Sequence, residues 1–224
     1  LGYGPSSFEG GPFVAHRLRL RALGCSLRLL TVENSAVVSR VAEDHPMTDS
    51  QQDYQTIRCR STADFLAALP QLAGFTATDS LFVVLFTGAQ AERAVRFGLP
   101  SSEEPSESTR LLDLVCDILS EVGAAGDPDA APALVISSAL SFEEAGGTPW
   151  RRLARRIERR FRRERIGLRE LCCIAPDGWV SYIESGAPQH GHPISEIEAS
   201  PVALEALVNG DPIPDLSTLG ELPI

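Results

Sequence analysis

Hydrophobic and polar positions repeat with two different periods along residues 57–210, and these periods divide the region into helices and strands. Apolar residues three or four positions apart are typical of amphipathic helices. They predict helices at 61–74, 109–126, 150–165 and 200–210. Short apolar runs that are rich in β-branched and aromatic residues are typical of buried strands. They predict strands at 79–86, 91–100, 133–138, 168–175 and 179–184.

Residues at the ends of these segments indicate where two of the helices begin and end. Ser61 or Thr62 is expected to cap the first helix, and Gly74 is expected to close it. Pro70 either kinks or ends that helix, because proline has no N–H to donate. In "GGTPW", residues 146–150, the threonine is the expected cap of the third helix and the proline its first residue.

The predicted elements follow one another in the order α-β-β-α-β-α-β-β-α. Two strand–helix–strand units in that order imply parallel neighbouring strands, and two hairpins imply antiparallel ones. We therefore expect a single α/β domain with a mixed parallel and antiparallel sheet and with helices packed on it.

Met47 is the only methionine of the chain, and the patterned sequence begins shortly after it, at Ile57. Residues 1–46 show no sustained alternation and little helical period. We therefore expect translation to start at Met47, which makes residues 1–46 a non-native or disordered extension. The rival interpretation is a genuine extension that is helical over residues 16–30. The expected divisions are then a polar leader at 47–56, the α/β domain at 57–219 and a tail at 220–224.

Composition excludes several classes of protein. With 43% hydrophobic and 22% charged residues, the 224-residue chain is of the globular type. All 20 cationic residues are arginine. The absence of lysine excludes a P-loop nucleotide site and a lysine Schiff base. Pyridoxal chemistry is excluded as well, because it needs that Schiff base. No apolar run reaches the roughly 20 residues of a membrane helix, so we expect a cytoplasmic protein without a membrane partner.

Five cysteines are present, with no C-x-x-C spacing. We expect them to be buried, reduced thiols, as is usual for cytoplasmic proteins. Cys172 and Cys173 are adjacent, so on a strand their side chains should point to opposite faces.

The segment "WRRLARRIERRFRRER", residues 150–165, is strongly basic in a chain whose formal charge is -10. Ten arginines and two glutamates between residues 151 and 169 give a local charge of +8. The apolar residues of the segment fall on one narrow helical face: Trp150, Leu153, Ile157 and Phe161. Arginines four positions apart oppose the helix by about 0.2–0.5 kcal/mol per pair, and the pairing of Glu158 with Arg162 offsets only part of this. Negative charge is therefore expected beside the helix.

Three sources of that negative charge are open. The first is the chain itself, through the acids of "SSEEPSE" and "SFEEAGG", which would leave the arginines as an ordinary solvated face. The second is an acidic protein partner or a second copy of the chain. The third is nucleic acid or another polyanion, although no aromatic residues lie among the arginines and no known nucleic-acid motif accompanies them. The candidate contact residues are Arg151, Arg152, Arg155, Arg156, Arg159, Arg160 and Arg163.

Gly146, Gly147 and Thr148 form a second, weaker candidate site. They connect a predicted strand to the arginine helix, and backbone amides at such a position can bind an anion. A plain loop-to-helix connection explains the same residues. No G-x-S-x-G elbow and no dinucleotide fingerprint is present, so the sequence supports neither an α/β-hydrolase nor a Rossmann enzyme.

His190 and His192 form a third candidate, because they stand two positions apart with Glu184 and Glu196 nearby in the sequence. Two imidazoles and a carboxylate could bind zinc. A solvated pair of loop histidines is the simpler interpretation, so we predict no metal and no cofactor.

Three segments carry a family resemblance. "IRCRSTADFLAALPQLAGFTATDSLFVVLF" resembles the opening of the uncharacterised bacterial family called domain of unknown function 4192, which is found mainly in high-GC Gram-positive bacteria. "GWVSYI" and "SPVALEALVNGDPIPDLSTL" are similar to its closing segments. The resemblance spans Ile57 to Leu219 and supports a start at Met47. It implies no activity and no catalytic residue. Members often carry cysteines after the "W-x-S-Y" strand, where this chain has "ESGAPQHGHPI", so any metal or pairing role of those cysteines is in doubt here.

These observations favour a non-catalytic binding or interaction module, dimeric on one interpretation, whose arginine helix sets the choice of partner. The alternatives are a nucleic-acid-associated protein that uses the same helix, and an enzyme with an anion pocket at Gly146–Trp150 and a titratable group from His190 or His192.

Overall fold

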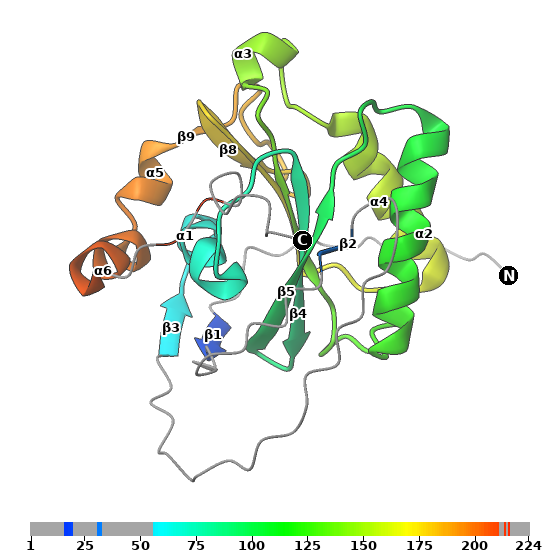
Figure 1. Ribbon diagram of the computed structural model, residues 1–224, viewed down its shortest axis with the longest axis horizontal. Helices are drawn as coiled ribbons and strands as arrows, with labels where there is room; N and C mark the ends of the chain where they lie inside the picture. Colours follow the sequence, from blue (N-terminus) through cyan, green and yellow to red (C-terminus); the bar gives the residue numbers. More distant parts are fainter. Residues whose placement is uncertain (1–15, 20–30, 33–55, 211–212, 214, 216–224) are drawn as a thin grey trace, which may run out of the picture.

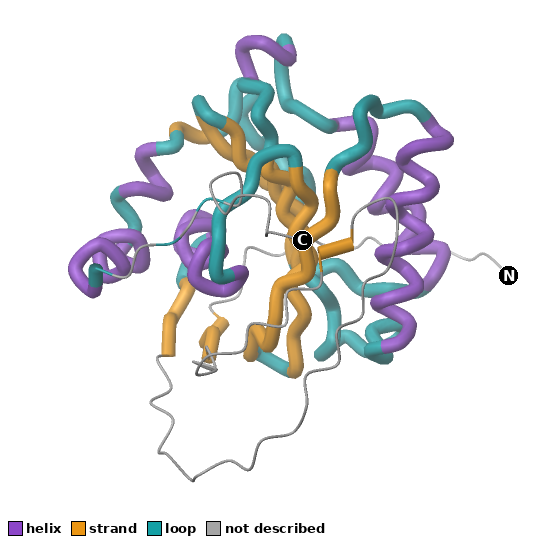
Figure 2. The backbone as a smooth tube through the Cα atoms, in the orientation of Figure 1, coloured by secondary structure: helices purple, strands orange, loops and turns teal. Residues whose placement is uncertain are grey.

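A computed structural model describes residues 16–19, 31–32, 56–210, 213 and 215 of the chain (Figure 1). A twisted central sheet carries helices on both of its faces, which gives three layers (Figure 2). The mixed α/β single domain that the sequence predicts is confirmed.

Within the described residues, the central sheet has seven strands in the order β2-β5-β4-β6-β7-β8-β9. Their bounds are β2 Thr31–Val32, β4 Ser80–Thr87, β5 Gln90–Gly98, β6 Ala133–Ser137, β7 Glu170–Ala175, β8 Gly178–Ser181 and β9 His192–Pro193. β6 and β7 pair in parallel, while β4–β5, β4–β6, β7–β8 and β8–β9 pair antiparallel. A separate antiparallel pair joins β1 (His16–Arg19) to β3 (Thr56–Cys59).

One expectation about strand neighbours was wrong. The unit β6–α4–β7 does join parallel neighbours, but β5 and β6 are not adjacent, because β4 lies between them and pairs with both. β4 is buried on both faces over residues 81–86, and a strand so apolar takes the centre of a sheet in preference to an edge.

The described residues form four longer helices, α1 Thr62–Ala73, α2 Pro105–Glu121, α4 Arg151–Glu164 and α6 Pro201–Asn209, and the first three cover the sheet. The Ser61 hydroxyl accepts the N–H of Asp64, and Gly74 ends α1 with a φ of 80°, as predicted. α1 continues through Pro70 to Ala73, so proline does not end this helix. α2 starts four residues earlier than expected because Pro105 occupies its first turn, where a missing N–H costs nothing.

The two faces of the sheet form two separate hydrophobic cores. α2 and α4 pack on one face, over residues such as Leu81, Val83 and Leu134. α1 packs on the other face, over residues such as Phe82 and Val84, and α6 adds Val202 to this core while it packs against α1 and β3. Cys173 lies in the first core and Cys172 in the second, which confirms that these neighbours point in opposite directions.

Several short elements did not show in the sequence pattern. α3 (Phe142–Ala145) begins with a capping box between Ser141 and Glu144, and α5 (Ser195–Glu198) precedes α6. β1 and β2 lie within residues 1–46, whose other positions fall outside the described residues. The expected start at Met47 stays a prediction, as do the leader and the tail.

Candidate functional site

The arginine helix α4 is fixed to the sheet by its apolar stripe. Leu153, Ala154, Ile157 and Phe161 are each at most 1% exposed and belong to the core beneath α4 and α2. The predicted apolar face is therefore confirmed. Its burial holds the helix axis against the sheet and turns the opposite face of α4 toward solvent.

The start of α4 differs from the sequence-based expectation. Thr148 is not the cap and Pro149 is not the first helical residue, because the capping position is taken by Trp150 with a left-handed φ of 53°. The carboxylate of Glu103 reaches this end of the helix and accepts the N–H of Leu153 at 2.7 Å. A carboxylate here satisfies a free helix donor and complements the positive end of the helix dipole.

Two of the candidate arginines bind the chain itself. Arg156 donates through Nη1 to the Glu103 carbonyl oxygen at 2.6 Å and to the Ser108 hydroxyl at 2.8 Å. Arg160 Nη1 lies 2.9 Å from a carboxylate oxygen of Asp113 on α2, and its Nε lies 3.1 Å from Glu164. The contact between Arg160 Nε and Glu164 is an ion pair that lacks the geometry of a hydrogen bond. These contacts clamp α4 to α2, and Asp113 and Glu164 are the acids that pair with an arginine on this side of the helix.

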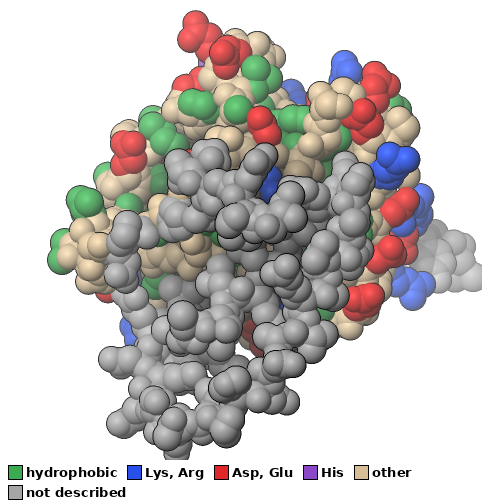
Figure 3. Space-filling model, viewed as in Figure 1, with side chains coloured by type: hydrophobic (Ala, Val, Ile, Leu, Met, Phe, Trp, Pro, Cys, Tyr) green, Lys and Arg blue, Asp and Glu red, His purple; other side chains and the backbone are tan. Residues whose placement is uncertain are grey.

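The solvent side of α4 is rich in arginine, with the partly exposed Glu158 at its border, and we call it the arginine face. Its exposed members are Arg151, Arg152, Arg155, Arg159, Arg162 and Arg163. Within the described part of the chain, only Arg163 has an ion-pair partner, Glu164 at 3.6 Å. The expected ion pair between Glu158 and Arg162 does not form. Glu164 instead forms ion pairs with Arg160 and Arg163. Figure 3 shows acidic and basic side chains interleaved along the edge of the molecule where α2 and α4 lie.

The arginine face carries repulsion between like charges that Glu164, which pairs with Arg163, relieves only in part. Arg151, Arg155, Arg159 and Arg163 follow one another at intervals of four residues, which places like charges next to each other on the helix surface. Each such pair costs about 0.2–0.5 kcal/mol. A bound anion would remove this cost. An anionic partner would therefore stabilise the helix in addition to its direct contacts with the arginines.

The second candidate site, at the loop before α4, is used internally. Gly146 ends α3 with a φ of 64°, and its N–H donates to the carbonyl of Glu143 at 3.1 Å. The N–H of Gly147 donates to the carbonyl of Phe142 at 2.9 Å. With these amides committed to the chain and Glu103 at the helix start, the geometry does not support an anion pocket that includes Thr148.

The two candidate histidines do not converge. His192 Nε2 lies 3.1 Å from Glu184, its Nδ1 lies 3.7 Å from Glu196, and its ring stacks on Trp179 with centroids 4.4 Å apart. The two carboxylates face opposite ring nitrogens, so they cannot share one ion with His192. His190 is exposed outside this cluster. Among the described residues, no group of three or more His, Cys, Asp or Glu side chains is placed to hold a metal ion.

The described cysteines are poor nucleophiles. Cys59, Cys116, Cys172 and Cys173 are free and buried, whereas Cys25 lies outside the described residues. Burial raises the pKa of Cys59 and of Cys173 to about 12, and nearby Asp64 adds to the effect at Cys59. Because the thiolate is the reactive form, these thiols are inert at neutral pH.

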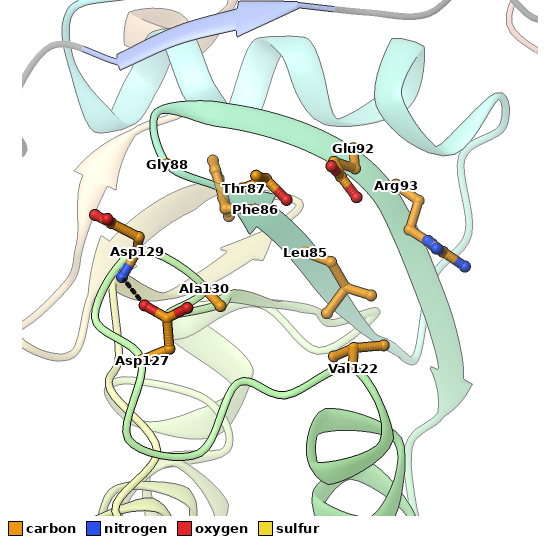
Figure 4. A pocket seen from close by; sticks show the side chains of 10 residues that line it. All are labelled: Leu85, Phe86, Thr87, Gly88, Glu92, Arg93, Val122, Asp127, Asp129 and Ala130. Carbon is orange, nitrogen blue, oxygen red and sulfur yellow. Dashed lines mark hydrogen bonds between the residues drawn. The ribbon is translucent and has the colours of Figure 1, made fainter.

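A small depression lies at the end of the β4–β5 hairpin and was not found from the sequence (Figure 4). Leu85 and Val122 give it apolar walls, and the carboxylates of Glu92, Asp127 and Asp129 stand around it. Its volume is about 190 Å³. Ligand pockets usually measure roughly 300–1,000 Å³, so this depression is small for a substrate site. The loop residues "DPD" are the sequence signal for its acidic rim.

A buried carboxylate was also missed. Glu170 is 4% exposed and accepts hydrogen bonds from Ser181 at 2.7 Å, Thr62 at 3.1 Å and the N–H of Leu171 at 2.9 Å. These partners join β7 to β8 and to the start of α1. The hydrogen bonds give Glu170 a structural role, since a buried carboxylate must be satisfied in this way.

No helix among the described residues is long and apolar enough to cross a membrane. The fold and the arginine face together define a three-layer α/β/α domain that presents one strongly basic helix. The chain belongs to the family described as "Domain of unknown function (DUF4192)", whose match covers residues 63–218. The predicted resemblance is therefore confirmed. No curated protein and no solved structure matches the chain.

Proposed function

We propose that this chain is a non-catalytic binding module whose contact surface for a polyanionic partner is the arginine face of α4. The observation that carries the proposal is the exposure of six arginines on one face, five of them without an ion partner among the described residues. Guanidinium groups bind phosphates and carboxylates through paired hydrogen bonds, so such a face suits a multiply charged anion.

The packing of α4 against the sheet and α2 supports the same proposal. Leu153, Ile157 and Phe161 hold the helix in the core, and Arg156 and Arg160 fasten it to α2. The helix backbone is thus fixed before a partner arrives, and a pre-formed surface loses less entropy on binding. The same burial speaks against membrane insertion, because the apolar stripe is already used.

The proposal includes a cytoplasmic location. The four described cysteines are buried free thiols, which suits a reducing compartment. An acidic protein and a second copy of the chain remain candidate polyanionic partners under this proposal. An enzyme is not favoured, since the depression at the hairpin is small and the amides of Gly146 and Gly147 bond within the chain.

The test is the binding of fluorescently labelled heparin, a generic polyanion, to the whole chain. Replacing Arg152, Arg155 and Arg159 by glutamine should weaken binding by about tenfold or more at low salt, because each lost contact removes counterion release. The matched control replaces Arg58, Arg60 and Arg93, three exposed arginines outside α4, by glutamine and changes the net charge equally. Equal weakening by both triple variants would show that net charge, not the arginine face, drives binding.

A further inference from the structure

The spacing of charges on α4 points to one particular polyanion. We propose that the arginine face holds a nucleic-acid duplex by its phosphates, without reading base sequence. This inference rests on the proposed function, because it names the partner of the same face.

Charge spacing is the first argument. From Arg151 to Arg163 the face is about 18 Å long, since an α-helix rises about 1.5 Å per residue. One strand of a duplex carries a phosphate charge every 3.4 Å or so, hence about five phosphates over that length. An acidic helix offers one carboxylate about every 6 Å along a row of residues four apart, hence about four in a row of that length. Six exposed arginines match the phosphate backbone more closely than they match an acidic helix.

The position of α2 is the second argument. α2 lies beside α4 and is joined to it through Arg156 and Arg160, so α4 cannot enter a groove alone (Figure 1). A helix with its side chains is about 10–12 Å across, and the major groove of a duplex is about 12 Å wide. The groove therefore admits one helix but not two side by side. The arginines can reach phosphates along the groove edge, whereas base edges stay out of reach.

The absence of stacking residues is the third argument. The aromatic residues of this segment, Trp150 and Phe161, pack toward the core, and Phe161 is 1% exposed. Proteins that hold single strands usually stack bases on exposed aromatic side chains. The arginine face offers none, so a double strand should bind more tightly than a single strand of the same length.

Acidic residues on α2 add a further feature to this surface. Asp117 and Glu121 are exposed one turn apart on α2, the helix that Arg156 and Arg160 join to α4. They would repel phosphates, so the duplex should lie over α4 and away from α2. Neutral replacements there should strengthen binding, and a gain of affinity cannot arise from misfolding.

The experiment measures fluorescence anisotropy of the full chain with two labelled duplexes of unrelated sequence, a labelled single strand and labelled polyglutamate. The two duplexes should bind within about twofold of each other, and the logarithm of affinity should fall with the logarithm of salt with a slope of about -4 to -5. The Arg152, Arg155 and Arg159 triple variant should reduce that slope by about 3. The double variant D117N/E121Q should bind a duplex several times more tightly.

Each contrary outcome would contradict a specific claim. Binding of polyglutamate without binding of a duplex would overturn the nucleic-acid inference and leave the proposed function standing, with an acidic protein as partner. A more than tenfold preference for one duplex, or for the single strand, would overturn contact through phosphates alone. Failure of heparin, duplex and polyglutamate to bind at low salt would overturn both proposals.

Discussion

At the scale of single residues, long-range contacts decide several positions that look ordinary in the sequence. Gly191 is an example: a methyl group on its Cα would lie 2.7 Å from the ring of Phe142 and 2.8 Å from the carbonyl oxygen of Trp179. Its φ is also positive, at 71°. The loop after β8 can therefore close against α3 only with glycine at this position.

Gly191 and Gly186 make a matched pair for testing this packing. Gly186 has a similar φ of 83° but open space around it. Replacing Gly186 by alanine should cost about 1–2 kcal/mol for the left-handed backbone alone. Replacing Gly191 should cost about 1–3 kcal/mol more, because the new methyl group overpacks the site. Urea unfolding measures both, and equal losses would contradict the close approach to Phe142.

Two glutamates predict a response to acid. The pKa of Glu107 is lowered by hydrogen bonds from the Ser102 N–H and hydroxyl, and that of Glu144 by the same groups of Ser141. A carboxyl group whose pKa is lowered by folding stabilises the protein above its ordinary value of 4.5, and this stability is lost as pH falls through the folded value.

The variant E107Q/E144Q should therefore lose less stability than the unchanged chain between neutral pH and the region below that ordinary value. Urea unfolding across this pH range measures the difference. The control is E104Q/E143Q, which replaces exposed neighbours whose side chains accept no hydrogen bond in the described residues. An equal flattening of the pH dependence by both pairs would contradict the account.

At the scale of elements, the sequence predicted what depends on local periodicity. The apolar stripe of α4, the caps of α1 and the hairpin strands follow from residues a few positions apart. The start of α4 could not be predicted, because Glu103, which accepts its free N–H, lies 50 positions earlier in the chain. The insertion of β4 between β5 and β6 is equally non-local, since pairing order depends on which strand buries both faces.

Two residues of α4 that lie two positions apart should respond very differently to mutation. Phe161 is 1% exposed in the core, whereas Arg159 is exposed on the arginine face. Phe161→Ala should lower the free energy of unfolding by about 3–5 kcal/mol. Arg159→Gln should change it by no more than about 0.5 kcal/mol. Urea unfolding measures both changes. A large loss of stability on replacing Arg159 would mean that its guanidinium group holds the fold together.

At the scale of the whole molecule, charge is distributed unevenly. The chain has a formal charge of -10, yet one helix face gathers six exposed arginines. The sequence indicated this polarity and named most of the arginines, but it could not say which of them face solvent. The structure separates the inner pair, Arg156 and Arg160, from the arginine face. Arg162 was not among the predicted contacts, and its place on the face follows from the helix orientation.

The most direct test of the account compares heparin binding by the unchanged chain with binding by the two triple arginine variants at low and raised salt. We predict that glutamine at Arg152, Arg155 and Arg159 weakens binding by about tenfold or more and flattens its salt dependence. Glutamine at Arg58, Arg60 and Arg93 should leave both nearly unchanged. Equal affinities for all three proteins would contradict the claim that the arginine face of α4 is the binding surface.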